Sequence, residues 1–106
     1  MKMVLWEGRY TIDKDKVAEY TKWAKEEALP YYLSLPGLKE FRGYRLSGSL
    51  RVLIEMEFDS FESWGKAMDN PKTKEQLSKQ ALYAHDLEWK LWDISPLIPQ
   101  PLKPKK

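Results

Sequence analysis

The chain has 106 residues, of which 42% are hydrophobic and 13% aromatic, a composition typical of one globular domain. It contains no cysteine, which excludes disulfides, thiolate metal sites and cysteine nucleophiles. The net charge of +2 depends on three lysines in the final PLKPKK, since the rest of the chain carries 15 basic and 16 acidic residues. A nucleic-acid partner needs a basic face on the folded body, so we expect none.

No apolar run approaches the roughly 20 residues of a membrane-spanning helix, and the opening MKMVLWEGRY lacks a signal-peptide core. We therefore expect a cytoplasmic protein with no membrane partner. Charged residues make up 32% of the chain, and it has a single asparagine. This composition resembles that of thermophile proteins, in which ion pairs replace heat-labile amides, although a mesophile with a lysine-rich surface is the alternative.

Residues 3–12 alternate between apolar and polar positions, a period of two that predicts a strand. Helical spacing follows, with one apolar face made of Val17, Tyr20, Thr21, Ala24, Ala28, Tyr31 and Leu35. Pro30 falls inside this pattern. Because proline lacks an amide donor, we expect it to kink the helix or to restart it as a short second segment.

Two further strands are predicted at residues 38–46 and 51–58, joined by a tight turn at SGS. Gly48 in that turn tolerates the positive φ that a hairpin requires.

A second helical region begins at DSFESW and is interrupted at DNP, where Asn70 is suited to cap a new segment and Pro71 to open it. The last predicted strand spans residues 87–94. After it, the chain holds four of its seven prolines, which is typical of extended backbone. We expect a domain at residues 1–94 and a proline-rich extended C-terminal tail at residues 95–106.

The order β-α-β-β-α-β predicts a ferredoxin-like α+β fold, in which a four-stranded antiparallel sheet of order 4-1-3-2 has helices on one face. The opposite face is mixed. It presents Leu5, Leu53 and a tryptophan of the last strand among charged residues, and Arg9 is expected to pair there with Glu55 or Glu57. Since exposed apolar patches mark interfaces, we expect a homodimer; the alternative is that the charged residues keep this face solvated.

The element order, the size, and the segments LPGL…FRGYRL and FDSFESWGKAMDNPKTKEQL resemble the dimeric α/β-barrel superfamily, most closely its antibiotic-biosynthesis-monooxygenase type. The resemblance covers residues 3–94. It implies that two sheets combine into a barrel and that a ligand lies between the sheet and the helices of each subunit. Some members are cofactor-independent oxygenases that use a tryptophan, an asparagine and a tyrosine around a polyphenolic substrate. Others degrade haem, with an asparagine on the first strand and a tryptophan and a histidine in the second helix.

Trp64 matches the tryptophan of these families, so the resemblance makes it a candidate catalytic residue. Gly8 stands at the position of the first-strand asparagine, and the stretch KTKEQLSK contains no histidine. These departures lead us to expect no haem, no other organic cofactor and no metal.

His85 is the single histidine of the chain and lies between the last helix and the last strand. It is a second candidate catalytic residue, because imidazole can act as a base near neutral pH. The alternative is that it caps helix carbonyls or meets solvent. A zinc site needs three or four ligands, and nothing around His85 has that spacing.

Aromatic side chains of the two helical regions form the candidate ligand site. We expect its lining to include Gly8, Tyr20, Trp23, Glu27, Tyr31, Tyr32, Phe61 and Trp64. In this hypothesis Gly8 leaves room for the ligand and Glu27 supplies a polar contact. Such a site suits a flat apolar or aromatic molecule, whereas the alternative is that these rings are ordinary core.

Two functional hypotheses remain open. In the first, the protein binds a small apolar or aromatic molecule between sheet and helices and is a monooxygenase-like enzyme without metal or organic cofactor. In the second, it is a non-catalytic dimeric binding or scaffolding module.

Overall fold

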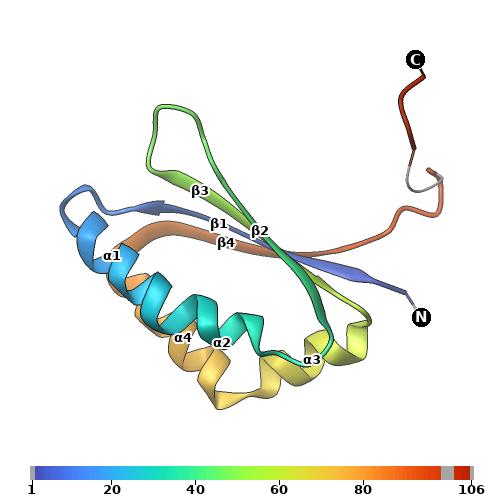
Figure 1. The fold of residues 1–106 in the computed structure, drawn as a ribbon, viewed down its shortest axis with the longest axis horizontal. Helices are drawn as coiled ribbons and strands as arrows, with labels where there is room; N and C mark the ends of the chain where they lie inside the picture. The colour runs from blue at the N-terminus through green and yellow to red at the C-terminus, as the bar shows by residue number, and fades with distance from the viewer. Residues whose placement is uncertain (1, 99–101, 106) are drawn as a thin grey trace.

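A computed structural model describes residues 2–98 and 102–105 of the chain. Its strands and helices are β1 (Val4–Ile12), α1 (Val17–Trp23), α2 (Leu29–Leu33), β2 (Leu38–Arg45), β3 (Arg51–Phe58), α3 (Phe61–Asp69), α4 (Pro71–Tyr83) and β4 (Ala84–Asp93). The sheet is antiparallel with strand order β2-β3-β1-β4, and the helices lie along one of its faces (Figure 1). The predicted ferredoxin-like α+β topology is confirmed.

The first helical region is divided as the proline predicts. α1 is followed by a π-helical turn at Ala24–Ala28, in which the amide of Leu29 donates to the carbonyl of Ala24. α2 then restarts the helix with Pro30 in its first turn, where a missing amide donor costs little. The wider turn and the restart place Tyr32 back over the sheet, where it is buried.

β4 begins at Ala84, earlier than the predicted start at residue 87. Ala84 and His85 pair with Ile12 and Thr11 of β1, but the register then shifts, and Asp86 adopts a φ of 54°. This bulge breaks the alternation of apolar and polar side chains at the strand's beginning. A period of two could not reveal these residues as strand for that reason.

The core lies between the helices and the sheet face predicted to be buried. Its buried hydrophobic residues are Val4, Trp6, Tyr10, Ile12, Trp23, Ala28, Tyr32, Leu35, Ile54, Met56, Phe58, Ala67 and Ala84. Trp89 of β4 also points to this side and stacks on Trp6, with ring centroids 4.3 Å apart. Large rings therefore fill the middle of the sheet under α2 and α3.

The opposite sheet face has no helix over it (Figure 1). Trp92 on this face is 47% exposed, and Leu5 and Leu53 are partly exposed. The expected pairing of Arg9 with Glu55 or Glu57 is wrong, because Arg9 lies opposite Leu53 and instead contacts Glu7 of its own strand at 3.2 Å.

The carboxylates of Glu55 and Glu57 instead form ion pairs with Arg42 of the edge strand β2, at 3.1 Å and 3.5 Å.

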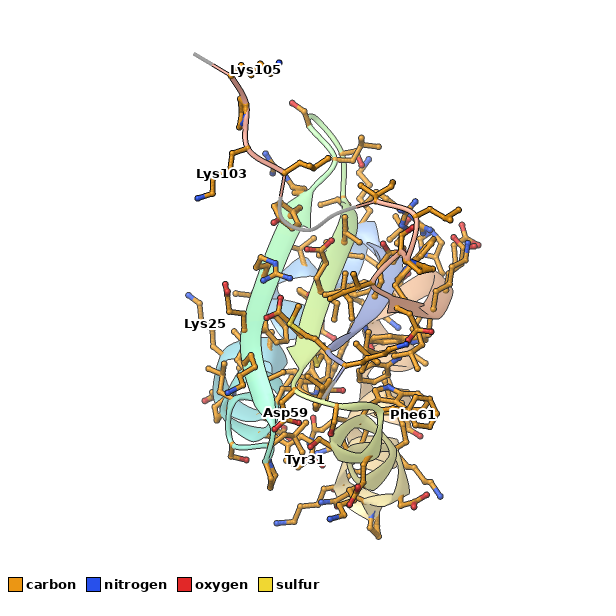
Figure 2. All side chains as sticks on the ribbon, turned by 90° about the vertical axis from the view of Figure 1, so that its right-hand side faces the viewer. Lys25, Tyr31, Asp59, Phe61, Lys103 and Lys105 are labelled. Atoms are coloured by element: carbon orange, nitrogen blue, oxygen red, sulfur yellow. The ribbon has the colours of Figure 1, made fainter. Side chains whose placement is uncertain are left out.

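Residues 94–98 and 102–105 carry neither helix nor strand. They lead away from the sheet in Figure 1, and Figure 2 shows Lys103 and Lys105 far from the helices. Residues 99–101 and 106 of the expected tail lie outside the described residues. No helix in the described part of the chain has the length and apolarity to cross a membrane.

Candidate ligand-binding site

A cavity of about 320 Å³ lies between the first helical region and the strands β2 and β3. Its lining residues are Tyr10, Tyr20, Trp23, Ala24, Ala28, Leu29, Tyr32, Phe41, Gly43, Tyr44, Arg45, Val52, Ile54 and Gln80. The lining is predominantly aromatic and aliphatic with a few polar groups, as is usual for sites that bind small organic molecules.

Gly43 creates much of this space. It pairs with Ile54 on the helix-facing side of the sheet, and a Cβ placed on it would meet no heavy atom within 4 Å. Its neighbours on the same side of β2, Phe41 and Arg45, also line the cavity. Because strand side chains alternate between faces, any larger residue at 43 would project into the cavity.

Four tyrosines line the cavity, of which Tyr44 is exposed, whereas Tyr10, Tyr20 and Tyr32 are buried or partly buried. The hydroxyls of Tyr10 and Tyr20 are hydrogen-bonded at 2.5 Å. The hydroxyl of Tyr32 is buried and has no hydrogen-bond partner among the described residues. Burial raises the pKa of all three phenols, and the adjacent Tyr20 raises that of Tyr10 further. They therefore remain neutral near pH 7 and can donate hydrogen bonds.

The predicted residues Tyr20, Trp23 and Tyr32 all line the cavity. Trp23 is held in place by a buried hydrogen bond from its Nε1 to the Oε1 of Gln76, at 2.8 Å. This bond ties α1 to α4 and orients the indole ring that forms one wall.

Gly8 does not provide the room expected of it. The ring of Trp89 from the neighbouring strand lies directly against its Cα, at the place a side chain would occupy. The space that the sequence suggested at Gly8 is therefore filled, and the open space lies two strands away at Gly43.

Four other expected lining residues lie outside the cavity, namely Tyr31, Glu27, Phe61 and Trp64, the last of which is described below. The hydroxyl of Tyr31 is hydrogen-bonded to Thr73 of α4 at 2.5 Å. Glu27 forms an ion pair with Lys79, and hydrogen bonding from that ammonium lowers the pKa of the carboxyl. Phe61 is 61% exposed, at the outer side of α3 (Figure 2).

Eleven lining residues were not expected from the sequence, among them Phe41, Gly43, Tyr44, Arg45, Val52, Ile54 and Gln80. A signal was present on β2, where the alternation of FRGYR puts Phe41, Gly43 and Arg45 on one side of the strand. Gln80 carried no comparable signal, because a polar residue on a helix is ordinarily exposed.

Comparisons with known proteins agree on the fold. SnoaB, a cofactor-independent oxygenase from Streptomyces nogalater, matches with a TM-score of 0.76 and 11% identity over 96% of this chain and 100% of SnoaB. A candidate antibiotic biosynthesis monooxygenase from Bacteroides thetaiotaomicron matches with a TM-score of 0.69 and 24% identity, over 97% of this chain and 96% of that one. Another from Deinococcus radiodurans has a TM-score of 0.74 and 14% identity, over 91% and 96%. No protein-family model and no curated protein matches the sequence.

The chain has the fold of the antibiotic-biosynthesis-monooxygenase proteins. These identities are low, so the likeness establishes the backbone arrangement and leaves the chemistry to the side chains. What this chain can bind is therefore argued from the residues that line its own cavity.

Trp64, the candidate catalytic residue suggested by the resemblance, does not line the cavity. It packs on the core from α3, its ring centroid 5.3 Å from that of Phe61. Its Nε1 is buried without a hydrogen-bond partner among the described residues. The indole is thus not among the groups that line the cavity together with Tyr10 and Tyr20.

His85, the other candidate catalytic residue, lies at the start of β4 with its side chain 55% exposed. Its Nδ1 is 2.6 Å from Oδ1 of Asp13, the residue that follows β1. The pair joins the ends of two neighbouring strands and lies outside the cavity lining. Among residues 2–98 and 102–105, no cluster of three or more His, Cys, Asp or Glu side chains could hold a metal ion.

Proposed function

We propose that this protein binds a small aromatic molecule in the cavity between the first helical region and strands β2 and β3. The observation that carries the proposal is Gly43, which opens the helix-facing side of a strand beside a wall of aromatic rings. Gly43 is exposed on the edge strand β2, so these apolar walls face solvent, and a flat apolar ligand would cover them. The neutral hydroxyl groups of the lining suit a ligand that carries a phenolic or ketone oxygen.

Closing the cavity at Gly43 tests this proposal. We expect 2-naphthol or anthrone to raise the melting temperature of the wild type, because a ligand that binds only the native state stabilises it. Gly43→Leu should abolish the shift, and Gly43→Ala should reduce it. Gly65→Ala serves as the matched control, since a Cβ there also meets nothing within 4 Å but lies on α3, outside the lining. An undiminished shift in Gly43→Leu, or no shift in the wild type, would contradict the proposal.

A cofactor-independent oxygenase is the second candidate function. It is supported by the fold shared with SnoaB and by the buried indole nitrogen of Trp64, which has no hydrogen-bond partner in the part of the chain that the structure describes. Oxidation of anthrone to the quinone would consume one O₂ and release one water. We expect oxygen uptake that depends on the protein and falls in Trp64→Phe. No oxygen uptake above that of buffer would contradict the oxygenase and favour the non-catalytic binding function. The absence of Trp64 from the cavity lining also supports non-catalytic binding.

The same proposal includes a homodimer formed through the open sheet face. That face carries Trp92, Leu5 and Leu53 without a helix over them, and it bears charges of both signs, so two copies can complement one another. Sedimentation at micromolar concentration should give the mass of two chains. Leu53→Arg should give one chain, whereas Leu82→Arg should not, because Leu82 is exposed on α4. A wild type that sediments as one chain would refute the dimer.

A further inference from the structure

We infer that Arg45 makes this cavity selective for aromatic acids, in which a carboxylate stands at one edge of a flat ring system. The inference rests on the proposed binding function and names the class of ligand. Arg45 is the one charged residue among the lining residues, and no aspartate, glutamate or lysine accompanies it. A site with a single uncompensated cation favours an anionic partner.

The other arginines of the chain show how unusual Arg45 is. Arg9 contacts Glu7, Arg42 contacts Glu40, Glu55 and Glu57, and Arg51 contacts Glu88. Arg45 forms no ion pair and no side-chain hydrogen bond within the described part of the chain. Among the described residues, its guanidinium is therefore the one of the four that no acidic side chain engages, so all of its donors can turn to a ligand.

The position of Arg45 also suits an anion at the mouth of the cavity. It is the last residue of β2 and is exposed, whereas Phe41 and Ile54, farther along the sheet, are more buried. A second hollow of about 420 Å³ adjoins it, lined by Arg9, Arg45 and Arg51 and by no acidic residue. Arg9 and Arg51 are paired there with Glu7 and Glu88, so Arg45 is the arginine of this hollow that no acidic side chain offsets.

The inner end of the cavity has a different character. Tyr10, Trp23 and Tyr32, which form its inner wall, are almost fully buried, and burial keeps the phenols of Tyr10 and Tyr32 neutral. A charged group would lose its hydration at that end, whereas an aromatic ring would not. The ligand is thus expected to enter ring first, with its carboxylate left beside Arg45.

Two probes that share one ring system separate the contribution of charge from that of shape. We expect calorimetric titration at neutral pH to show that 2-naphthoate binds the wild type about tenfold more tightly than 2-naphthylmethanol, the gain typical of a hydrogen bond to a charged group. Arg45→Gln should remove this preference, because it lowers the affinity for 2-naphthoate far more than the affinity for the alcohol. Arg45→Lys should retain part of it, because an ammonium keeps the charge but loses the planar, bidentate donors.

Lys90→Gln is the matched control, since it removes one positive charge from an exposed residue on the open sheet face. It should bind both probes as the wild type does. Equal affinity of the wild type for the two probes, or a preference that survives Arg45→Gln, would overturn the selectivity while binding itself stands. Failure of both probes to bind the wild type would overturn the selectivity together with the proposed function.

Discussion

The indole ring of Trp89 in β4 lies against the backbone of Gly8 in β1, its partner across the sheet. The ring occupies the space that a side chain at position 8 would fill. The same ring stacks on Trp6 with an interplanar angle of 25°. This contact holds the middle of the sheet together, and it explains why the residue at position 8 is the smallest one available.

Gly8→Ala should therefore destabilise the protein. A Cβ would drive Trp89 off its position on Trp6, and overpacking of this kind costs about 1–3 kcal/mol of unfolding free energy. Urea denaturation followed by tryptophan fluorescence measures the change. Gly65→Ala is the control, because open space surrounds that helical position, and alanine should stabilise the helix by about 0.5–1 kcal/mol. Equal effects of the two substitutions would show that Trp89 is free to move.

Gly37 and Gly48 allow backbone strain to be separated from steric contact. Both have positive φ, of 84° and 75°, but a Cβ on Gly37 would collide with the side chain of Ser63, whereas one on Gly48 would meet nothing within 4 Å. Alanine at 48 should cost about 1 kcal/mol for the left-handed backbone alone. Alanine at 37 should cost about 2–4 kcal/mol, because the collision adds to it. Denaturation midpoints of the two variants check the difference, and similar values would contradict the contact with Ser63.

The hydrogen bond between Trp23 and Gln76 predicts a coupling between two helices. Trp23→Phe removes the donor and leaves the buried amide oxygen of Gln76 without its partner, at a cost of about 1–3 kcal/mol beyond the change in packing. Gln76→Met leaves the indole nitrogen similarly unpaired. The double variant should be less destabilised than the sum of the single variants, since it leaves neither group unpaired. Strict additivity in a double-mutant cycle would mean that the bond contributes nothing.

The buried phenols predict a loss of stability at alkaline pH. The pKa values of Tyr10, Tyr20 and Tyr32 are raised in the folded protein from the ordinary value of 10.0, mainly by burial. Their contribution is therefore fully present below pH 10.0 and is lost as the pH rises above it, because the unfolded chain then releases protons that the folded protein retains. The free energy of unfolding should fall steadily above that pH.

Tyr10→Phe isolates the effect of one phenol from that of lysines that titrate in the same range. Its unfolding free energy should fall less steeply with pH than that of the wild type. A slope identical to that of the wild type would show that the Tyr10 hydroxyl ionises as readily in the folded protein as in the unfolded chain.

The fold followed from local patterns. Alternation along residues 3–12 and 51–58 placed the correct side chains on the buried face, and Pro30, Asn70 and Pro71 marked real ends of helical segments. These features depend on backbone geometry and on the side chains of near neighbours, which the order of residues determines. The start of β4 was missed because a bulge removes the alternation there.

The site did not follow in the same way. The chain order identified Gly8 as a glycine on the helix-facing side of its strand and did not single out Gly43. It could not show that Trp89 covers the first and that the space at the second stays open. Likewise, the sequence does not distinguish the four arginines from one another. The tertiary structure gives acidic partners to Arg9, Arg42 and Arg51. Periodicity determines which face a side chain occupies, whereas occupied space and ion pairing depend on neighbours that are distant in sequence. The sequence alone therefore determined the fold class, and the tertiary structure decided where this protein has room for a ligand.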